Sequence, residues 1–340
     1  MSDRLTLEVI RDSLQSSRQD AIRSYRQSLR PDALLAALSR CADQTLNKLL
    51  ERYPLPEGAT LTAVGGYGRG ELFPFSDVDL LILLQGEPDT KAEASLSGLV
   101  AAMWDVGLEP GYSVRTIEQC VKEARADITV ETSLLESRWI AGSKSLAKVF
   151  SQTMTEHLDA KQFFRAKRAE MQQRHARFQD TPYSLEPNCK ESPGGLRDLQ
   201  VIMWMARAAG FGSSWQAIAR AGLLTSAEAR DLKRAEQAFK RVRIELHLLV
   251  NRREDRLLFD LQHGLAQAYD IAATATRRAS ELLMQRYYWA ARLVTQLNTL
   301  LVQNIEERLF ALQDIEARVL DENYISRQYR LDIQDELLFE

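Results

Sequence analysis

The 340-residue sequence is poor in cysteine and carries little excess charge, and each shortage excludes a class of protein. Cys41, Cys120 and Cys189 lie far apart, so they form neither a metal-binding spacing nor a disulfide framework, which fits a reducing compartment. The 44 Lys and Arg residues against 47 Asp and Glu leave a net charge of −3. That balance argues against a general nucleic-acid or membrane-surface binder, although it allows one local basic cleft.

Long apolar runs are also missing. No segment approaches the roughly 18 consecutive apolar residues of a membrane-spanning helix. The N-terminal stretch MSDRLTLEVIRDSLQSSRQD is charged and lacks the apolar core of a signal peptide. We therefore expect a cytoplasmic protein that does not associate with membranes.

Proline is absent from the second half of the chain. All nine prolines fall between Pro31 and Pro193, and none occurs from Gly194 to the end. Because proline inside a helix costs about 3 kcal/mol, such a stretch is typical of nearly continuous helix. Apolar residues at alternating three- and four-residue steps over 232–249 and 283–301 predict two core-facing stripes of a helical bundle.

The first half of the chain predicts a different architecture. The patterns favour helix over 1–52, strand over 59–64, strand over 78–84, helix over 90–106, strand over 112–116, and one or two further helices up to Gly142. The predicted fold class is therefore α+β: a small mixed β-sheet with helices, followed by an all-α helical bundle.

One motif carries the chemistry: Gly65-Gly-Tyr-Gly-Arg-Gly-Glu71, followed by Ser76-Asp-Val-Asp79 at the start of the second strand. A phosphate loop of the NTPase type requires Gly-Lys-Ser/Thr at its end, and none is present. A dinucleotide fingerprint requires glycine where Glu71 stands, so that template fails as well. Strand alternation places Asp77 and Asp79 on the same face.

Two neighbouring carboxylates repel and raise each other's pKa unless a cation lies between them. Mg²⁺ binds a few carboxylates together with substrate phosphates, so it would remove the conflict. Gly65 and Gly66 allow the backbone to approach a triphosphate closely. An Asp-x-Asp pair alone is typical of a solvated strand end, but the preceding glycine turn and the following apolar run favour a metal-assisted phosphoryl-transfer site.

This motif resembles the nucleotidyltransferase superfamily, which includes DNA polymerase beta and kanamycin nucleotidyltransferase. Within it the chain resembles the N-terminal part of the bifunctional PII uridylyltransferase/uridylyl-removing enzyme family. Four further segments carry the narrower resemblance: Trp104-Asp-Val-Gly, Gly111-Tyr-Ser-Val-Arg-Thr116, Ser133-Leu-Leu-Glu-Ser-Arg138, and the stretch from Tyr183 to Asp198. The last also resembles an element of glutamine synthetase adenylyltransferase.

The resemblance implies transfer of UMP from UTP to a tyrosine of the PII signal protein, with release of pyrophosphate. It further implies that Asp77 and Asp79 hold Mg²⁺, with Mn²⁺ as an alternative ion, and that Gly65 and Gly66 contact the triphosphate. Ser76 would support the turn or touch a phosphate. The implied domains are an N-terminal helical segment (1–55), a nucleotidyltransferase domain (56–145) and a helical domain (146–340).

Members of the superfamily usually have a third carboxylate on a neighbouring strand, which serves as metal ligand or general base. The aligned stretch Gly111-Tyr-Ser-Val-Arg115 has no acid at its first position. Glu109, two residues earlier, is the preferred candidate, and Asp127 and Glu131 are alternatives.

Three basic residues are candidates for binding the triphosphate. Lys190 and Arg197 lie where the helical domain begins, and both a lysine charge and an arginine fork suit phosphate. The same segment also fits a simple helix entry, with Asp198 in the first turn where the helix dipole favours a carboxylate. Arg69 is the third candidate, although an ion pair with Glu71 or Asp79 explains it equally well.

Other readings remain open. No His-Asp dipeptide occurs, so we expect the HD-type removal domain to be absent, together with the ACT sensing domains. The interpretation is a fragment or a shortened form with the transferase half only. Adenylyl transfer to glutamine synthetase or another protein is the nearest alternative. A degenerate, nucleotide-sensing module is the other, and the intact Asp77/Asp79 pair argues against it.

Overall fold

The computed structural model describes residues 2–311, and a four-stranded sheet lies at the centre of its first half. The strands are β1 (Thr60–Ala63), β2 (Val78–Leu83), β3 (Pro110–Arg115) and β4 (Arg138–Gly142). Their order is β3-β2-β1-β4, with β2 and β3 parallel and the other two pairs antiparallel. The predicted α+β class with a small mixed sheet is confirmed.

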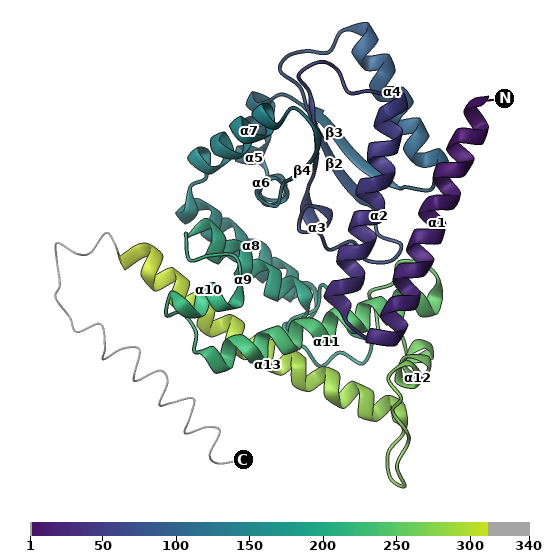
Figure 1. Ribbon diagram of the computed structural model, residues 1–340. Helices are drawn as coiled ribbons and strands as arrows, with labels where there is room; N and C mark the ends of the chain where they lie inside the picture. Colours follow the sequence, from purple (N-terminus) through teal and green to yellow (C-terminus); the bar gives the residue numbers. More distant parts are fainter. Residues whose placement is uncertain (1, 312–340) are drawn as a thin grey trace.

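Helices cover both faces of this sheet (Figure 1). The helices of the first half are α1 (Ser2–Ser28), α2 (Pro31–Arg52), α3 (Gly65–Gly68), α4 (Thr90–Asp105), α5 (Ile117–Ala126), α6 (Ile128–Leu135) and α7 (Lys144–His157). Leu80 and Ile82 of β2 belong to the main core, which also includes residues of α2 and α4. Leu81 and Leu83 alternate to the opposite face and pack in a second core with α5, α6 and α7. A strand buried on both faces explains the continuous apolar run.

The sequence did not predict β4, where we expected only helix up to Gly142. The strand has five residues and pairs with β1 through a register shift between Leu61 and Thr62. Of its side chains only Ile140 is fully buried. A single buried residue in so short a strand leaves no alternation for a sequence pattern to reveal.

The second half is helical, as the lack of proline predicts. Its helices are α8 (Ala160–Arg177), α9 (Leu196–Ala208), α10 (Trp215–Arg220), α11 (Ser226–Val250), α12 (Phe259–Ala268) and α13 (Ala279–Ala311). The predicted stripe of α11 is buried from Leu232 to Leu246, but Leu249 is 45% exposed. Nothing in residues 2–311 forms a helix both long and apolar enough to cross a membrane. The predicted helical stretch beyond Ala311 lies outside the described residues.

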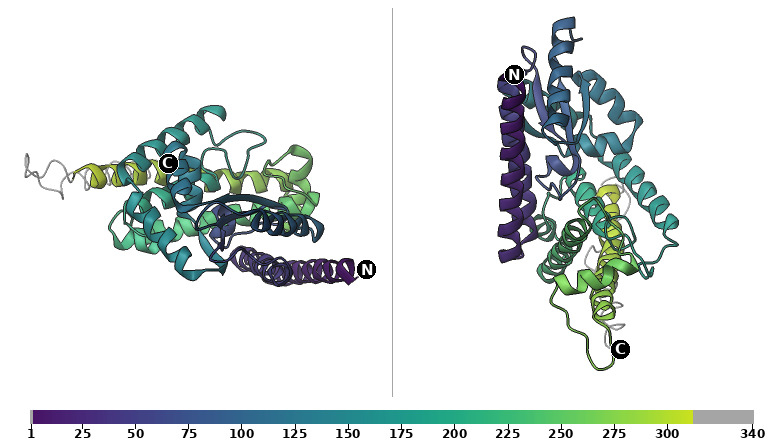
Figure 2. Two further views of the ribbon diagram at one scale, coloured as in Figure 1. Left: turned by 90° about the horizontal axis from the view of Figure 1, so that it is seen from above. Right: turned by 90° about the vertical axis from the view of Figure 1, so that its right-hand side faces the viewer.

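The helices α1 and α2 form a long hairpin along one side of the molecule (Figure 1, Figure 2). The hairpin contacts the helical half directly, because Tyr25 Oη donates to Glu245 Oε1 of α11 at 2.8 Å. Leu34, Leu38 and Leu46 of α2 share one core with Leu80 of the sheet. Since one core joins these parts, the division at residues 55 and 145 stays a prediction.

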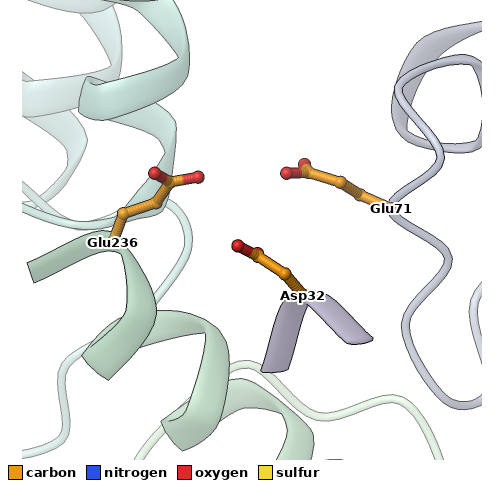
Figure 3. Close-up of side chains that lie close together, drawn as sticks. All are labelled: Asp32, Glu71 and Glu236. Carbon is orange, nitrogen blue, oxygen red and sulfur yellow. The ribbon is translucent and has the colours of Figure 1, made fainter. Parts of the chain in front are cut away.

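A cluster of charges around the buried Lys240 connects the hairpin, the glycine-rich segment and α11. Figure 3 shows Asp32, Glu71 and Glu236 pointing toward one another. The ammonium of Lys240 lies among them, with Nζ at 3.0 Å from Asp32 Oδ1, 2.5 Å from Glu71 Oε1 and 2.6 Å from Glu236 Oε1. Burial alone would lower the pKa of Lys240, but Glu71 and Glu236 raise it above its usual value, so the ammonium stays charged.

These three carboxylates have the spacing of a metal site, yet Lys240 already neutralises them. A dication placed there would face the ammonium at close range and repel it. Lys233 adds further contacts, at 3.0 Å to Asp32 and 3.2 Å to Glu236. We interpret the cluster as an ion-pair network that connects α2, the glycine-rich segment and α11, and not as a metal centre.

Replacing Lys240 by Met tests the role of this ion-pair network in stability. The change removes the buried ammonium that contacts Asp32, Glu71 and Glu236, so the free energy of unfolding should fall by about 1–3 kcal/mol in urea denaturation. Lys233→Met is the matched control, because Lys233 is 40% exposed and contacts two of the same carboxylates. It should cost less than about 1 kcal/mol. Equal losses of unfolding free energy in the two variants would contradict the interpretation that Lys240 is the central residue of this network.

Candidate active site

The glycine turn directly follows β1 and lies over one of the two aspartates. Gly65 has φ +56°, a left-handed conformation that favours glycine. A Cβ at Gly65 would lie 3.6 Å from Asp79 Oδ2 and 3.7 Å from Ser133 Oγ. Gly68 is sterically required, since a Cβ there would come within 2.0 Å of the Glu136 carbonyl oxygen. The motif therefore brings bare backbone next to the Asp79 carboxylate.

Asp77 and Asp79 flank the buried Val78 at the start of β2, and both are exposed. The alternation that the sequence predicts thus places the two carboxylates on one face. Partial burial and then the charge of Asp77 raise the pKa of Asp79, while Arg253 and Lys190 oppose that shift. Mutual repulsion between neighbouring carboxylates is the condition that a divalent cation relieves, so the pair fits a Mg²⁺ site.

The neighbouring strand β3 offers space beside Asp79 but no acid. Asp79 pairs with Gly111, and a Cβ at Gly111 would lie 2.8 Å from Asp79 Oδ1. Glu109 is the residue next to Asp77, because its carbonyl oxygen accepts from Val78 N at 2.9 Å. Its side chain is exposed, and its charge acts on Arg18 of α1.

The other two candidates for the third carboxylate have different surroundings. Asp127 caps α6 by accepting from Thr129 N at 2.7 Å. Burial and the charge of Asp159 raise the pKa of Glu131. None of the three candidates is among the groups that act on Asp79. Glu109 stays the preferred prediction because of its place beside Asp77 in the sheet.

Two paired loops of the helical half bring positive charge to the aspartates. Cys189 N donates to the Asp255 carbonyl oxygen at 2.8 Å, and Leu257 N donates to that of Pro187 at 2.9 Å. Lys190 lies on the first loop and Arg253 on the second. Arg253 Nη1 donates to Asp77 Oδ2 at 3.1 Å.

Burial, together with the charges of Arg243 and Arg197, lowers the pKa of Lys190 to about 8. Its Nζ lies 3.5 Å from Glu191 Oε1, and its charge acts on Asp79. A cation held partly desolvated near Asp79 is suited to bind phosphate oxygens. The role of Lys190 as a triphosphate ligand stays a prediction, which this position favours.

Arg253 was not predicted from the sequence, because it belongs to no motif. It follows the left-handed Asn251 that ends α11, in the run Asn-Arg-Arg-Glu-Asp-Arg. Three arginines just after a helix end are the signal in the sequence, but only the folded chain brings one of them to Asp77.

Arg197 and Asp198 have well-defined contacts within the helical half. Arg197 donates to Gln200 Oε1 at 2.9 Å and to Glu191 Oε1 at 3.1 Å. Asp198 is fully buried and accepts from Gly194 N at 2.7 Å, as well as from Arg174 and His175. The helix-entry interpretation of Asp198 is therefore correct. Arg197 as a phosphate ligand stays a prediction, one that requires it to leave Glu191.

Arg69 contacts carboxylates and points into the molecule. Its Nε donates to Glu71 Oε2 at 2.9 Å and its Nη1 to Glu136 Oε2 at 2.5 Å. Glu136 also accepts from Trp204 Nε1 of α9. The ion pair with Glu71 was one of the two interpretations of Arg69, and these contacts favour it over nucleotide binding. Through Glu71 the network continues to Lys240.

Ser76 lies in the turn that leads to the aspartates. Its backbone N donates to the Phe73 carbonyl oxygen at 3.2 Å, which closes the turn before Asp77. Phe75, which lies within this turn just before Ser76, has φ +58°, a left-handed conformation that costs a non-glycine residue roughly 1–3 kcal/mol. The segment that positions Asp77 is thus under local strain and depends on neighbouring contacts.

Comparison with known proteins gives two family matches in this chain. Residues 42–135 match the family described as nucleotidyltransferase domain, and residues 162–302 match the family described as GlnD PII-uridylyltransferase. The first match contains Gly65, Asp77, Asp79 and Glu109, and the second contains Lys190 and Arg253.

Curated relatives are similar along almost the whole chain. A bifunctional uridylyltransferase/uridylyl-removing enzyme of Bordetella avium is 68% identical over 98% of this chain. Proteins with the same description from Cupriavidus pinatubonensis and Burkholderia orbicola are each 49% identical over 97%. The chain spans only 38–39% of the length of these relatives. Together the matches show that the chain contains a nucleotidyltransferase domain followed by a helical region similar to the GlnD PII-uridylyltransferase family.

Proposed function

We propose that this chain transfers UMP from UTP to a tyrosine of the PII signal protein and releases pyrophosphate. The observation that carries the proposal is the pair of exposed carboxylates, Asp77 and Asp79, facing Lys190 and Arg253 of the helical half. The relatives' description as uridylyltransferases supports the choice of nucleotide, and the family description supports PII as the acceptor.

In this reaction the tyrosine oxygen attacks the α-phosphorus of UTP. The bond from that phosphorus to the bridging oxygen of the β-phosphate breaks, and pyrophosphate leaves with the electron pair. Catalysis of such a step consists mainly of positioning and of stabilising charge on the phosphate oxygens. Lys190 and Arg253 would hold the triphosphate, while backbone groups of Gly65 and Gly66 approach it from the sheet.

Asp77 and Asp79 would bind the divalent cation, Mg²⁺ or Mn²⁺, and Ser76 would support the turn beside them. A bound cation would neutralise the phosphate oxygens and favour departure of pyrophosphate. The proton of the tyrosine hydroxyl requires an acceptor, and Glu109 is the nearest carboxylate to Asp77 along the sheet. Arg253 holds Asp77 in the structure and would contact phosphate once the cation takes over that carboxylate.

The choice of nucleotide is tested by incubating the chain with purified PII and either labelled UTP or labelled ATP. We expect label on a PII tyrosine from UTP alone. Exclusive use of ATP would contradict the proposal and favour the adenylyltransferase alternative. Binding of either nucleotide without any transfer would favour the sensing module.

Replacing both Asp77 and Asp79 by Asn tests the metal assignment. Transfer should fall at least roughly a thousandfold, because the cation loses its ligands. The melting temperature at neutral pH should be unchanged or higher, since the raised pKa of Asp79 means that its ionised form is disfavoured in the folded chain. Near-normal turnover, or an unfolded variant, would contradict the assignment.

Because the pKa of Lys190 is about 8, the pH dependence of the KM for UTP tests whether this side chain binds phosphate. As the pH rises through that value the side chain loses its charge, so the KM for UTP should rise up to roughly tenfold between about pH 7 and pH 9. Lys190→Arg keeps its charge over this range and should give a flatter profile. Identical profiles for the two proteins would remove Lys190 from the phosphate site.

A further inference from the structure

A buried histidine connects the aspartate-bearing segment to the loop that carries Arg253. His247 lies in the last turn of α11 and has no exposed surface. Its Nδ1 is 2.6 Å from the Pro74 carbonyl oxygen, and its Nε2 is 3.1 Å from Asp255 Oδ1. Pro74 precedes Asp77 by three residues, and Asp255 follows Arg253 by two. The imidazole therefore bridges the two segments that meet at the candidate site.

Both partners of His247 are hydrogen-bond acceptors. Burial alone would raise the pKa of Asp255, but the hydrogen bond from His247 and the charge of Arg243 hold it well below its usual value. Asp255 is thus a carboxylate, and a carbonyl oxygen has no proton to donate. A ring N–H can donate to such an acceptor, and each ring nitrogen of His247 lies within hydrogen-bond distance of one.

The contact to Pro74 acts on the strained part of the turn. The Pro74 carbonyl belongs to the same peptide plane as the nitrogen of Phe75, the residue with φ +58°. A hydrogen bond that fixes the orientation of this peptide plane also fixes the direction of the backbone toward Ser76 and Asp77. Strained conformations persist only where surrounding contacts determine them.

Phe73 adds a second attachment of the same turn to α11. Its ring centroid lies 6.2 Å from that of His247 in an edge-to-face arrangement. The guanidinium of Arg243 lies 4.1 Å from the same Phe73 centroid, and Arg243 Nε donates to Asp255 Oδ1 at 2.6 Å. One face of α11 thus holds both the turn and the loop that carries Arg253.

We propose that His247 is a positioning residue of the transferase site, which sets Asp77 and Asp79 relative to Arg253 and Lys190. It touches neither substrate nor cation. It acts on the aspartates through the Pro74 carbonyl, while Asp255, which Arg243 also holds, orients the ring. The inference rests on the proposed function, because it assigns His247 a role in that same site. In this proposal the contact of His247 with the Pro74 carbonyl oxygen is the one that determines the position of Asp77 and Asp79.

Two substitutions separate the two contacts of the ring. In His247→Asn the side-chain amide stands where Nδ1 stood, so it can still donate to the Pro74 oxygen but cannot reach Asp255. In His247→Gln the longer amide stands near the place of Nε2, so it can donate to Asp255 but not to Pro74. Both are neutral, polar and smaller than histidine, so each serves as a control for the other.

We expect kcat for UMP transfer to fall roughly tenfold to a hundredfold in His247→Gln, since small displacements of reacting groups have effects of that size. The Mg²⁺ concentration for half-maximal rate should rise in parallel. His247→Asn should stay within roughly fivefold of the unchanged protein in both quantities. Equal effects of the two substitutions on kcat and on Mg²⁺ dependence would overturn the proposal.

Amide hydrogen exchange over residues 72–80 supplies a readout that needs no turnover. Exchange there should be faster in His247→Gln than in His247→Asn, while exchange in α13 stays the same in both. If the unchanged chain fails to label PII, the proposed function fails, and the exchange comparison still decides the role of His247. Identical exchange over 72–80 in the two variants would overturn that role.

Discussion

Pairing of buried charge between the glycine-rich segment and the helical half is the interaction on which the site depends. A charge removed from water is costly unless a partner of opposite sign lies within a few ångströms. Arg69 and Glu71 meet this requirement through Glu136 of the first half and Lys240 of α11. The segment that begins with Gly65 and Gly66 is therefore held in place from both halves of the chain.

The same constraint divides the basic residues into two kinds. Arg69 and Arg197 donate to carboxylates of the protein, at distances between 2.5 and 3.1 Å. Lys190 and Arg253 also contact protein carboxylates, Glu191 at 3.5 Å and Asp77 at 3.1 Å, but in addition their charges act on Asp79, which we assign to the cation. A chain with a net charge of −3 can in this way present a local basic surface to a triphosphate.

Local patterns predicted the parts of the site that lie close together in the sequence. The glycine turn, the strand 78–83 and the shared face of Asp77 and Asp79 follow from backbone freedom and strand alternation. The helical second half follows from the absence of proline. By contrast, β4 could not be predicted, because five residues with one buried side chain carry no periodicity. The contacts of His247 could not be predicted either, since its place in the helical stripe of α11 says nothing of hydrogen-bond partners.

Taken alone, the sequence determined the fold class, the placement of Asp77 and Asp79 on one face and the family resemblance, because each depends on residues a few positions apart. Only the tertiary structure decided which basic residues face the aspartates. Arg253 is 176 positions from Asp77, and His247 is 173 positions from Pro74. Contacts over such separations depend on how α11 packs against the turn after α3, and that packing is set by the whole core and by the paired charges around Lys240.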